Sequence, residues 1–553
     1  MDKRTLLAFI LSFIILVGWS LYFGPKQEQA PVKQDIPAHV SGQEPAASPA
    51  PAVGPVSESF SASSELPPPA VPNEKEIEID TPLYRAVFSN AGPTIRSFKL
   101  KKYRETTDPA SPLIDLVSLK KEMGDFLLIG FDNHSAGKKE NMVFQVDEDA
   151  IHVDPDSPAK DLVFKGTTPE GLTVVQTFRF YWDRYQIDFH IDVTNASQTP
   201  VEGVFKGNLK AMPPADKGGY YSYVGFALLL ENSLEEVKVE DPSEEKTLMG
   251  PLGWVAYEDN YFMTAIVPDV PVEGTFIGRH LASGILEGIY LQPTVSIPPS
   301  GTISSGYELY LGPRDLGILK DFGKDLDRAI NFGWTNIIAK PLLYVLRFFN
   351  GYIQNYGVSI ILLTILVKIL FWPLTHKSYK SMKEMQKLQP RMMKLREKYK
   401  NDKQKLNQEM MALYKTYKVN PMGGCLPMIV QIPVFFALFR VLGGCIELRH
   451  APFALWINDL SAPDRLFHFP FQIPFMAPPY GIPVLTLLMG ASMFIQQKMT
   501  PTPGDPAQAK IMLFLPIIFT FMFINFPSGL VLYWLVNNVI SIGQQYRIHK
   551  KPA

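Results

Sequence analysis

Residues 358–374 read VSIILLTILVKILFWPL, an apolar run with one charged side chain, Lys368. A helix needs about 20 such residues to cross the hydrocarbon core of a bilayer, so this run predicts a membrane span. A charge within a span costs at least ~2.5 kcal/mol near the centre and usually faces an aqueous cavity. We therefore expect Lys368 to mark a functional site. The alternative is that its stem reaches the nearby membrane surface.

Similar apolar runs flank this one and predict a helical membrane bundle. Residues 511–539 are too long for one span and contain Asn525–Gly529, a turn sequence, so they predict two spans. The core domain is expected at residues 351–547. Its five expected spans lie at about 353–374, 422–442, 482–498, 510–526 and 529–546.

A sixth span is predicted at the N-terminus, within residues 1–24. Lys3 and Arg4 precede its apolar run, as they would in a cleaved signal peptide, which is the alternative. Trp19 and Tyr22 near its end resemble the aromatic belt of a retained span, and no small-residue cleavage site follows. We expect a retained anchor.

Charge predicts how the chain is oriented. From residue 346 onward it has 23 Lys and Arg against 8 Asp and Glu, whereas the preceding part has 30 against 46. The segment 376–418, between two expected spans, has 13 basic residues against 4 acidic ones. Because basic loops stay on the cytoplasmic side, both termini and the short basic tail 548–553 are expected there. The acidic segment between the first two spans is then exported.

The exported segment divides into three parts. Residues 25–75 contain 11 prolines and predict a disordered linker. From residue 76 to about 318, short runs of alternating polar and apolar residues predict a large all-β sandwich. Residues 319–350 show apolar positions at helical spacing, which predicts an amphipathic helix on the outer membrane surface. Packing of its first half on the sandwich is an equal alternative.

The sequence offers no catalytic constellation. It contains no HExxH, Walker A or GxGxxG motif, and none of its nine histidines lies in an expected span. Two cysteines, Cys425 and Cys445, exclude both a disulfide scaffold and a four-cysteine zinc site. We therefore expect no enzyme activity, no metal and no cofactor. The expected spans also lack acidic residues, which argues against an ion-coupled transporter.

Two further features can contact a partner. Residues 376–418 have apolar side chains, including Met385 and Met392, at helical spacings on either side of Asn401–Asp402. They predict a basic helical hairpin, which could bind anionic headgroups, ribosomal RNA or a nascent chain, or could form a solvated coiled-coil pair. The other spans contain polar residues, among them Gln431, Gln496 and Asn537, whose simplest role is hydrogen bonding between helices.

Several contiguous motifs resemble the YidC/Oxa/Alb family of membrane protein insertases in its long Gram-negative form. They are residues 408–415 (QEMMALYK), 419–427 (VNPMGGCLP), 431–433 (QIP), 451–457 (APFALWI) and 526–534 (FPSGLVLYW). The resemblance covers essentially the whole chain. It implies a multi-domain inner-membrane protein with a first-span anchor, a periplasmic β-super-sandwich dispensable for much of the activity, and five core spans around a hydrophilic groove.

The resemblance also implies roles for individual residues. Lys368 stands where the family usually has a groove arginine, so the charge is kept without the bidentate fork. Thr364, Tyr533 and Trp534 match positions along which a client span slides. The implied function is insertion and chaperoning of nascent inner-membrane proteins, alone or with the Sec translocon and the ribosome. DNA is not an expected partner. The alternative is a membrane-anchored periplasmic protein that binds or processes carbohydrate.

Overall fold

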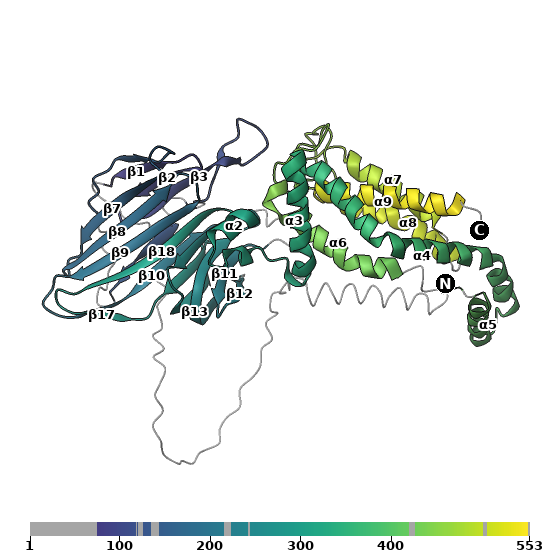
Figure 1. The fold of residues 1–553 in the computed structure, drawn as a ribbon, viewed down its shortest axis with the longest axis horizontal. Helices are drawn as coiled ribbons and strands as arrows, with labels where there is room; N and C mark the ends of the chain where they lie inside the picture. Colours follow the sequence, from purple (N-terminus) through teal and green to yellow (C-terminus); the bar gives the residue numbers. More distant parts are fainter. Residues whose placement is uncertain are drawn as a thin grey trace, which may run out of the picture. The chain divides into compact units, whose positions relative to one another are not determined.

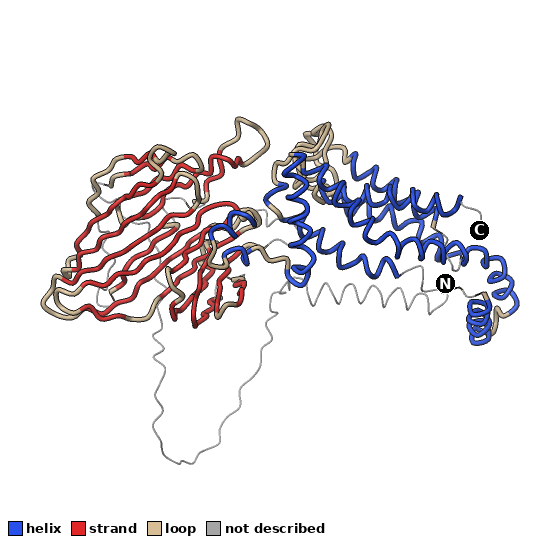
Figure 2. The backbone as a smooth tube through the Cα atoms, in the orientation of Figure 1, coloured by secondary structure: helices blue, strands red, loops and turns tan. Residues whose placement is uncertain are grey.

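The computed structural model describes residues 74–117, 119, 125–133, 143–214, 223–239, 241, 244–417, 419, 426–500 and 506–550. The expected anchor 1–24 and nearly all of the expected linker 25–75 lie outside these residues, as does Cys425. The described residues form a β part followed by a helical part, drawn in Figures 1 and 2.

The β part contains two sheets. The smaller has the order β4-β3-β2-β1-β6, and the larger has the main path β17-β10-β16-β15-β13-β14-β18-β9-β8-β7, with β5, β11 and β12 paired beside it. The strands are β1 (Glu76–Asp80), β2 (Tyr84–Ser89), β3 (Thr94–Arg104), β4 (Leu113–Asp115), β5 (Leu127–Asp132), β6 (Ala150–His152), β7 (Ala159–Thr167), β8 (Leu172–Tyr181), β9 (Gln186–Asn195), β10 (Val201–Ala211), β11 (Gly225–Leu230), β12 (Ser233–Val237), β13 (Glu245–Glu258), β14 (Phe262–Pro268), β15 (Val272–His280), β16 (Leu286–Leu291), β17 (Val295–Ile297) and β18 (Thr302–Pro313).

Alternation along the strands builds the core between the two sheets. Strand β9 shows it well, because every second residue from Ile187 to Val193 is buried. Phe88 of the small sheet packs edge-on against Phe178 of the large sheet, with ring centroids 5.1 Å apart. The period of two in the sequence therefore predicts the faces correctly. The pairing is antiparallel except between β1 and β6, which are parallel.

The helical part follows β18. It contains α2 (Leu316–Phe322), η2 (Leu326–Ala329), η3 (Gly333–Thr335), α3 (Asn336–Ile353), α4 (Tyr356–Lys398), α5 (Lys403–Thr416), α6 (Leu426–Gly444), η5 (Ile446–Leu448), α7 (Val484–Met499), α8 (Pro506–Phe523) and α9 (Ser528–Lys550). Within the described residues, α4 is the one helix both long and apolar enough to cross a membrane, and Val430–Gly444 and Met512–Phe523 are shorter apolar helices.

Two expected elements differ in the structure. The single helix expected over 319–350 is wrong in its first half, where α2 stops at Gly323 and two short 3-10 turns precede α3. Lys324 and Asp325 have left-handed backbone angles there, which an α-helix does not allow. The span expected to end at 374 instead continues through Pro373 as one 43-residue helix, which includes the first arm of the hairpin.

Candidate functional site

Lys368 lies buried between α4 and α9. The residue is only 5% exposed, and its ammonium donates a hydrogen bond of 2.7 Å to the Ser541 hydroxyl. Two turns further along α4, the Thr375 hydroxyl accepts a bond of 3.0 Å from the Gln544 amide. Residues seven apart share a helix face, so both bonds join the same face of α4 to α9. Lys368 therefore has a protein partner within the helical part.

A third bond brings α6 to the same stripe of α9. The Gln431 amide donates to the Asn537 side-chain carbonyl at 3.2 Å. Asn537, Ser541 and Gln544 lie at helical positions i, i+4 and i+7, which place them on one face. We call the six residues on α4, α6 and α9 the polar seam: Lys368, Thr375, Gln431, Asn537, Ser541 and Gln544.

An adjacent face of α9 bonds to α7. The Asn538 amide donates to the Ser492 hydroxyl at 3.0 Å, and the Gln545 amide donates to the Thr500 hydroxyl at 3.5 Å. Helix α9 packs along α4 and α7 over most of its length, whereas it contacts α6 over a shorter stretch. The α6 side of the polar seam is therefore the less extensively packed side.

Thr364 and Tyr533 extend the seam by one turn. Thr364 lies four residues before Lys368, is 1% exposed, and donates its hydroxyl to the Ile360 carbonyl at 2.7 Å. Tyr533 lies four residues before Asn537, is 3% exposed, and hydrogen bonds with Gln431. Two of the three residues expected to line a client path are thus covered.

Trp534 faces a different surface from Tyr533. Its ring packs edge-on against Phe435 of α6 and Phe523 of α8, with centroids 4.8 Å and 4.6 Å apart. Adjacent helical residues point about 100° apart, so the expected pair cannot line one narrow path. Gln496 of α7 is half-buried, and the described hydrogen bonds do not connect its side chain to the seam.

The groove that the resemblance implies would be lined by polar side chains of α4, α6 and α9. The polar side chains that would line it bond to one another, and Lys368 has little exposed surface. Sequence reasoning did not single out Thr375, Ser541 or Gln544 among the polar residues of the helices. The i, i+4, i+7 spacing that continues from Asn537 along α9 is the signal that identifies Ser541 and Gln544.

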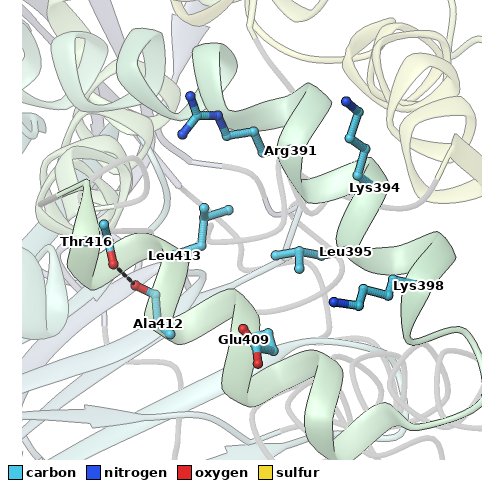
Figure 3. A pocket seen from close by; sticks show the side chains of 8 residues that line it. All are labelled: Arg391, Lys394, Leu395, Lys398, Glu409, Ala412, Leu413 and Thr416. Carbon is cyan, nitrogen blue, oxygen red and sulfur yellow. Dashed lines mark hydrogen bonds between the residues drawn. The ribbon is translucent and has the colours of Figure 1, made fainter.

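The hairpin formed by the end of α4 and by α5 carries a second site, shown in Figure 3. Basic side chains of α4 and one acidic side chain of α5 surround an apolar floor; the lining residues are Arg391, Lys394, Leu395, Lys398, Glu409, Ala412, Leu413 and Thr416. Among the described residues, no ion pair within 4 Å joins Glu409 to these three basic residues. The cleft has an excess of positive charge.

The contact residues expected on the hairpin need correction. Met385 and Met392 are 5% and 3% exposed, because the apolar stripe at helical spacing packs inside the hairpin. The Met392 sulfur lies 3.9 Å from the Tyr414 hydroxyl of α5. Met393 and Met411 are the exposed methionines, at 54% and 53%. A partner of the hairpin therefore meets these two residues and the basic rim.

Comparison with known proteins identifies the family. A family model described as "60Kd inner membrane protein" matches residues 348–553, and one described as "YidC periplasmic domain" matches residues 76–345. The chain belongs to the YidC family of membrane protein insertases. A YidC insertase of Syntrophus aciditrophicus is 44% identical to it, over 100% of both chains. The predicted family is therefore confirmed.

Two solved structures also resemble the chain. A YidC insertase crystal structure with its first transmembrane domain resolved is 19% identical, covers 86% of this chain and 93% of its own, and has a TM-score of 0.37. An α-galactosidase of Geobacillus stearothermophilus is 9% identical over 46% of this chain and 42% of its own, with a TM-score of 0.32. These scores are too low to support an argument.

Membership in the YidC family settles the broad function. The chain is a membrane protein insertase of the inner membrane, with a β-rich periplasmic domain and a helical C-terminal region. The carbohydrate alternative is not favoured, because the insertase relative matches the chain along its whole length.

Proposed function

We propose that a client span enters this insertase between α6 and α9, and that the polar seam receives the client's polar flank. The observation that carries this proposal is the Gln431–Asn537 hydrogen bond, which closes the seam on its less extensively packed side. A bond between two neutral side chains contributes only about 0.6 kcal/mol on average in a membrane protein. Exchange of this hydrogen bond for hydrogen bonds to a client therefore costs little free energy.

The seam lowers the barrier to insertion and performs no chemical step. Carrying a polar group into hydrocarbon without a hydrogen bond costs about 4–8 kcal/mol. Side chains such as Asn537, Ser541 and Gln544 offer replacement bonds partway across. The driving force is then burial of the client's apolar side chains in lipid, at about 25 cal/mol per Å². Insertion needs no nucleotide in this scheme.

Lys368 selects the flank that crosses. Its ammonium is a point charge held by Ser541, and it attracts acidic residues of an outward-bound flank without requiring bidentate geometry. The basic flanks of a client are repelled and stay on the cytoplasmic side, as positive-inside topology requires. The seam and its charge thus favour one orientation of the client.

The hairpin of α4 and α5 meets the nascent chain before insertion. Its basic rim at Arg391, Lys394 and Lys398 suits acidic segments, and its exposed Met393 and Met411 suit apolar ones. We place this hairpin and both termini on the cytoplasmic side, where the ribosome delivers clients. The Sec translocon is a further partner within this proposal.

Reconstitution tests the proposed function. The purified full chain is placed in liposomes with a small single-span client and no nucleotide, and protease protection of the client reports insertion. We expect insertion to depend on the protein. A chaperone that only assembles inserted spans would give none. In a second preparation, residues 76–312 are replaced by a flexible linker, which keeps Asp315 as the N-cap of α2. Loss of insertion there would favour a sandwich-based activity.

A further inference from the structure

The loop between α6 and α7 contains a long uncharged segment. Residues 466–482 read LFHFPFQIPFMAPPYGI and include no Asp, Glu, Lys or Arg. The loop lies at the end of the helical bundle where α4 begins, because the Asn355 amide that caps α4 donates to the Phe453 carbonyl at 3.0 Å. Figure 1 shows this end opposite α5. With α5 on the cytoplasmic side, the loop lies at the outer face of the bundle.

This segment exposes its apolar side chains. Phe467, Phe471 and Phe475 are 66%, 60% and 85% exposed. In a water-soluble protein, large aromatic side chains are normally buried. The apolar surface continues into the neighbouring helix, where Leu487 and Leu488 of α7 are each 51% exposed. A contiguous exposed apolar patch of this kind marks a membrane or protein contact.

A buried polar base holds the segment in place. Arg465 is 7% exposed, and its guanidinium donates to the Pro479 and Ile524 carbonyls at 2.8 Å each. Asn525, in the turn between α8 and α9, accepts from the Ala477 amide at 2.8 Å and donates to the Phe475 carbonyl at 2.9 Å. The segment that carries the exposed Phe residues is therefore held in place by hydrogen bonds with Arg465 and Asn525.

The same base anchors the loop to α7. The neighbouring Asp464 is 3% exposed, accepts from the Trp456 indole at 2.5 Å, and accepts from the Leu485 amide at the start of α7. Phe467 and Phe475 both have left-handed backbone angles, with φ of 58° and 64°. Bulky residues rarely adopt such angles, so the surroundings fix these two outward-pointing positions.

The length of the helices places the segment within the bilayer. Helix α7 has 16 residues. At 1.5 Å per residue it spans about 24 Å, short of the roughly 30 Å thickness of the hydrocarbon core. The uncharged segment ends two residues before α7 starts, so it extends the apolar height of this short span at its outer end. A water-exposed loop at that position would show charged residues instead.

We propose that residues 466–482 are embedded in the outer leaflet, with Phe467, Phe471 and Phe475 inserted among the acyl chains near the headgroup boundary. The partner is lipid, because the segment lacks charge and is continuous with the exposed apolar surface of α7. A protein-binding surface would carry a polar rim, and its strongest contacts would favour Trp, Tyr and Arg. This inference rests on the membrane orientation given under the proposed function.

Spin-label accessibility tests the proposal in the full-length protein. Both native cysteines are replaced by serine, and single cysteines are introduced at Phe471 and Phe475 for labelling in liposomes. Glu273→Cys on β15 serves as the control in water, because that residue is exposed in the periplasmic domain. Ile518→Cys on α8, 61% exposed, serves as the control in lipid. Collision rates with oxygen and with a water-soluble nickel chelate are measured for each label.

We expect labels at 471 and 475 to collide with oxygen as at 518, and several-fold less with nickel than at 273. Nickel accessibility equal to that at 273 would overturn the proposal, because the loop would lie in water. Shielding from both reagents would also overturn it, because protein would cover the loop. If position 518 behaves like lipid while 471 does not, the placement of the bundle in the bilayer stands and the loop inference alone fails.

Discussion

Each buried polar group of the seam has a partner, and this pairing determines what single substitutions do. Lys368 has Ser541, which in turn donates its own hydroxyl proton to the Asn537 carbonyl at 2.7 Å. The hydrogen bonds between α9 and the other seam residues are therefore all made by one face of α9, at Asn537, Ser541 and Gln544. Loss of the charge at 368 and loss of its partner at 541 should have different consequences, which separates an electrostatic role from a structural one.

Removal of the charge should affect clients selectively. We expect Lys368→Ala to reduce insertion of clients with acidic translocated flanks about fivefold, as loss of a ~1 kcal/mol charge interaction would. Clients with neutral flanks should change little, and Lys368→Arg should retain activity. Ser541→Ala is the matched control, since it keeps the ammonium. Insertion of clients that differ only in flank charge is measured for each variant. Equal loss for both flanks would point to misfolding instead.

A buried carboxylate in the sandwich predicts a pH dependence. Glu258 is 1% exposed, and burial raises its pKa from 4.5 to about 7 despite Arg314, whose guanidinium lies 3.2 Å away. The folded state thus holds the proton more tightly than the unfolded state. This contribution to stability is complete below pH 4.5 and is lost as the pH rises to 7. The loss amounts to at most about 3 kcal/mol.

Substitution isolates that contribution. Glu258→Gln cannot titrate, so its thermal unfolding temperature should rise relative to the natural chain as the pH increases from 4.5 to 7. Above pH 7 the difference between the two should become constant. The measurement is unfolding of the sandwich followed by near-ultraviolet circular dichroism at several pH values. Parallel curves for the two proteins across this range would show that Glu258 does not titrate there.

The sequence predicts single residues well where a charge stands alone and poorly where packing decides. Lys368 is conspicuous in an apolar run, and the structure pairs it with the Ser541 hydroxyl. Tyr533 and Trp534 are adjacent in the sequence, but they face the seam and an aromatic cluster respectively. Periodicity alone cannot show which neighbour covers each face of α9.

At the scale of elements, α4 joins the two proposed sites. It carries Lys368 in its first half and the basic rim of the hairpin in its second half, without a break. Lys368 and Arg391 are 23 residues apart, or roughly 35 Å along the axis at 1.5 Å per residue. A flank captured at the hairpin therefore follows one rigid element towards the seam.

Photo-cross-linking tests where a client meets the hairpin. A cross-linker at Met393 or Met411 should capture a stalled nascent chain, whereas one at the buried Met392 should capture little. Capture should weaken with added salt, because solvent-exposed charges are screened beyond about 8 Å at physiological ionic strength. Products that contain only lipid would show that the hairpin is a membrane-surface element. Equal capture from 392 and 393 would contradict the packing seen here.

Elements were predictable where one signal dominated. Alternation predicts the strands, and apolar side chains at helical spacing predict the hairpin. Its helices are separated at residues 399–402, where Asp402 caps α5. The helix bounds in the amphipathic segment 319–350 were predicted less well, because its apolar residues keep helical spacing across residues where the helix is interrupted. The left-handed angles at Lys324 and Asp325 depend on packing that the helical pattern does not report.

At the scale of the whole molecule, the helical part is held together unevenly. Helix α9 is fixed to α4 and α7 by close packing and by hydrogen bonds along its length, while α6 meets it over a shorter stretch. The composition of the chain does not reveal this inequality, because all these helices are apolar. It follows from which faces meet, and it supports our proposal that α6 separates from α9 when a client enters.

A reversible lock across the seam tests this claim most directly. In a background without native cysteines, Gln431→Cys and Asn537→Cys are joined by a short cleavable thiol cross-linker, and insertion is measured in liposomes before and after cleavage. The control pair, Ser492→Cys and Asn538→Cys, joins α7 to an adjacent face of α9. We predict that the first lock blocks insertion and that cleavage restores it, while the control lock has little effect. Normal insertion with α6 locked to α9 would contradict the account.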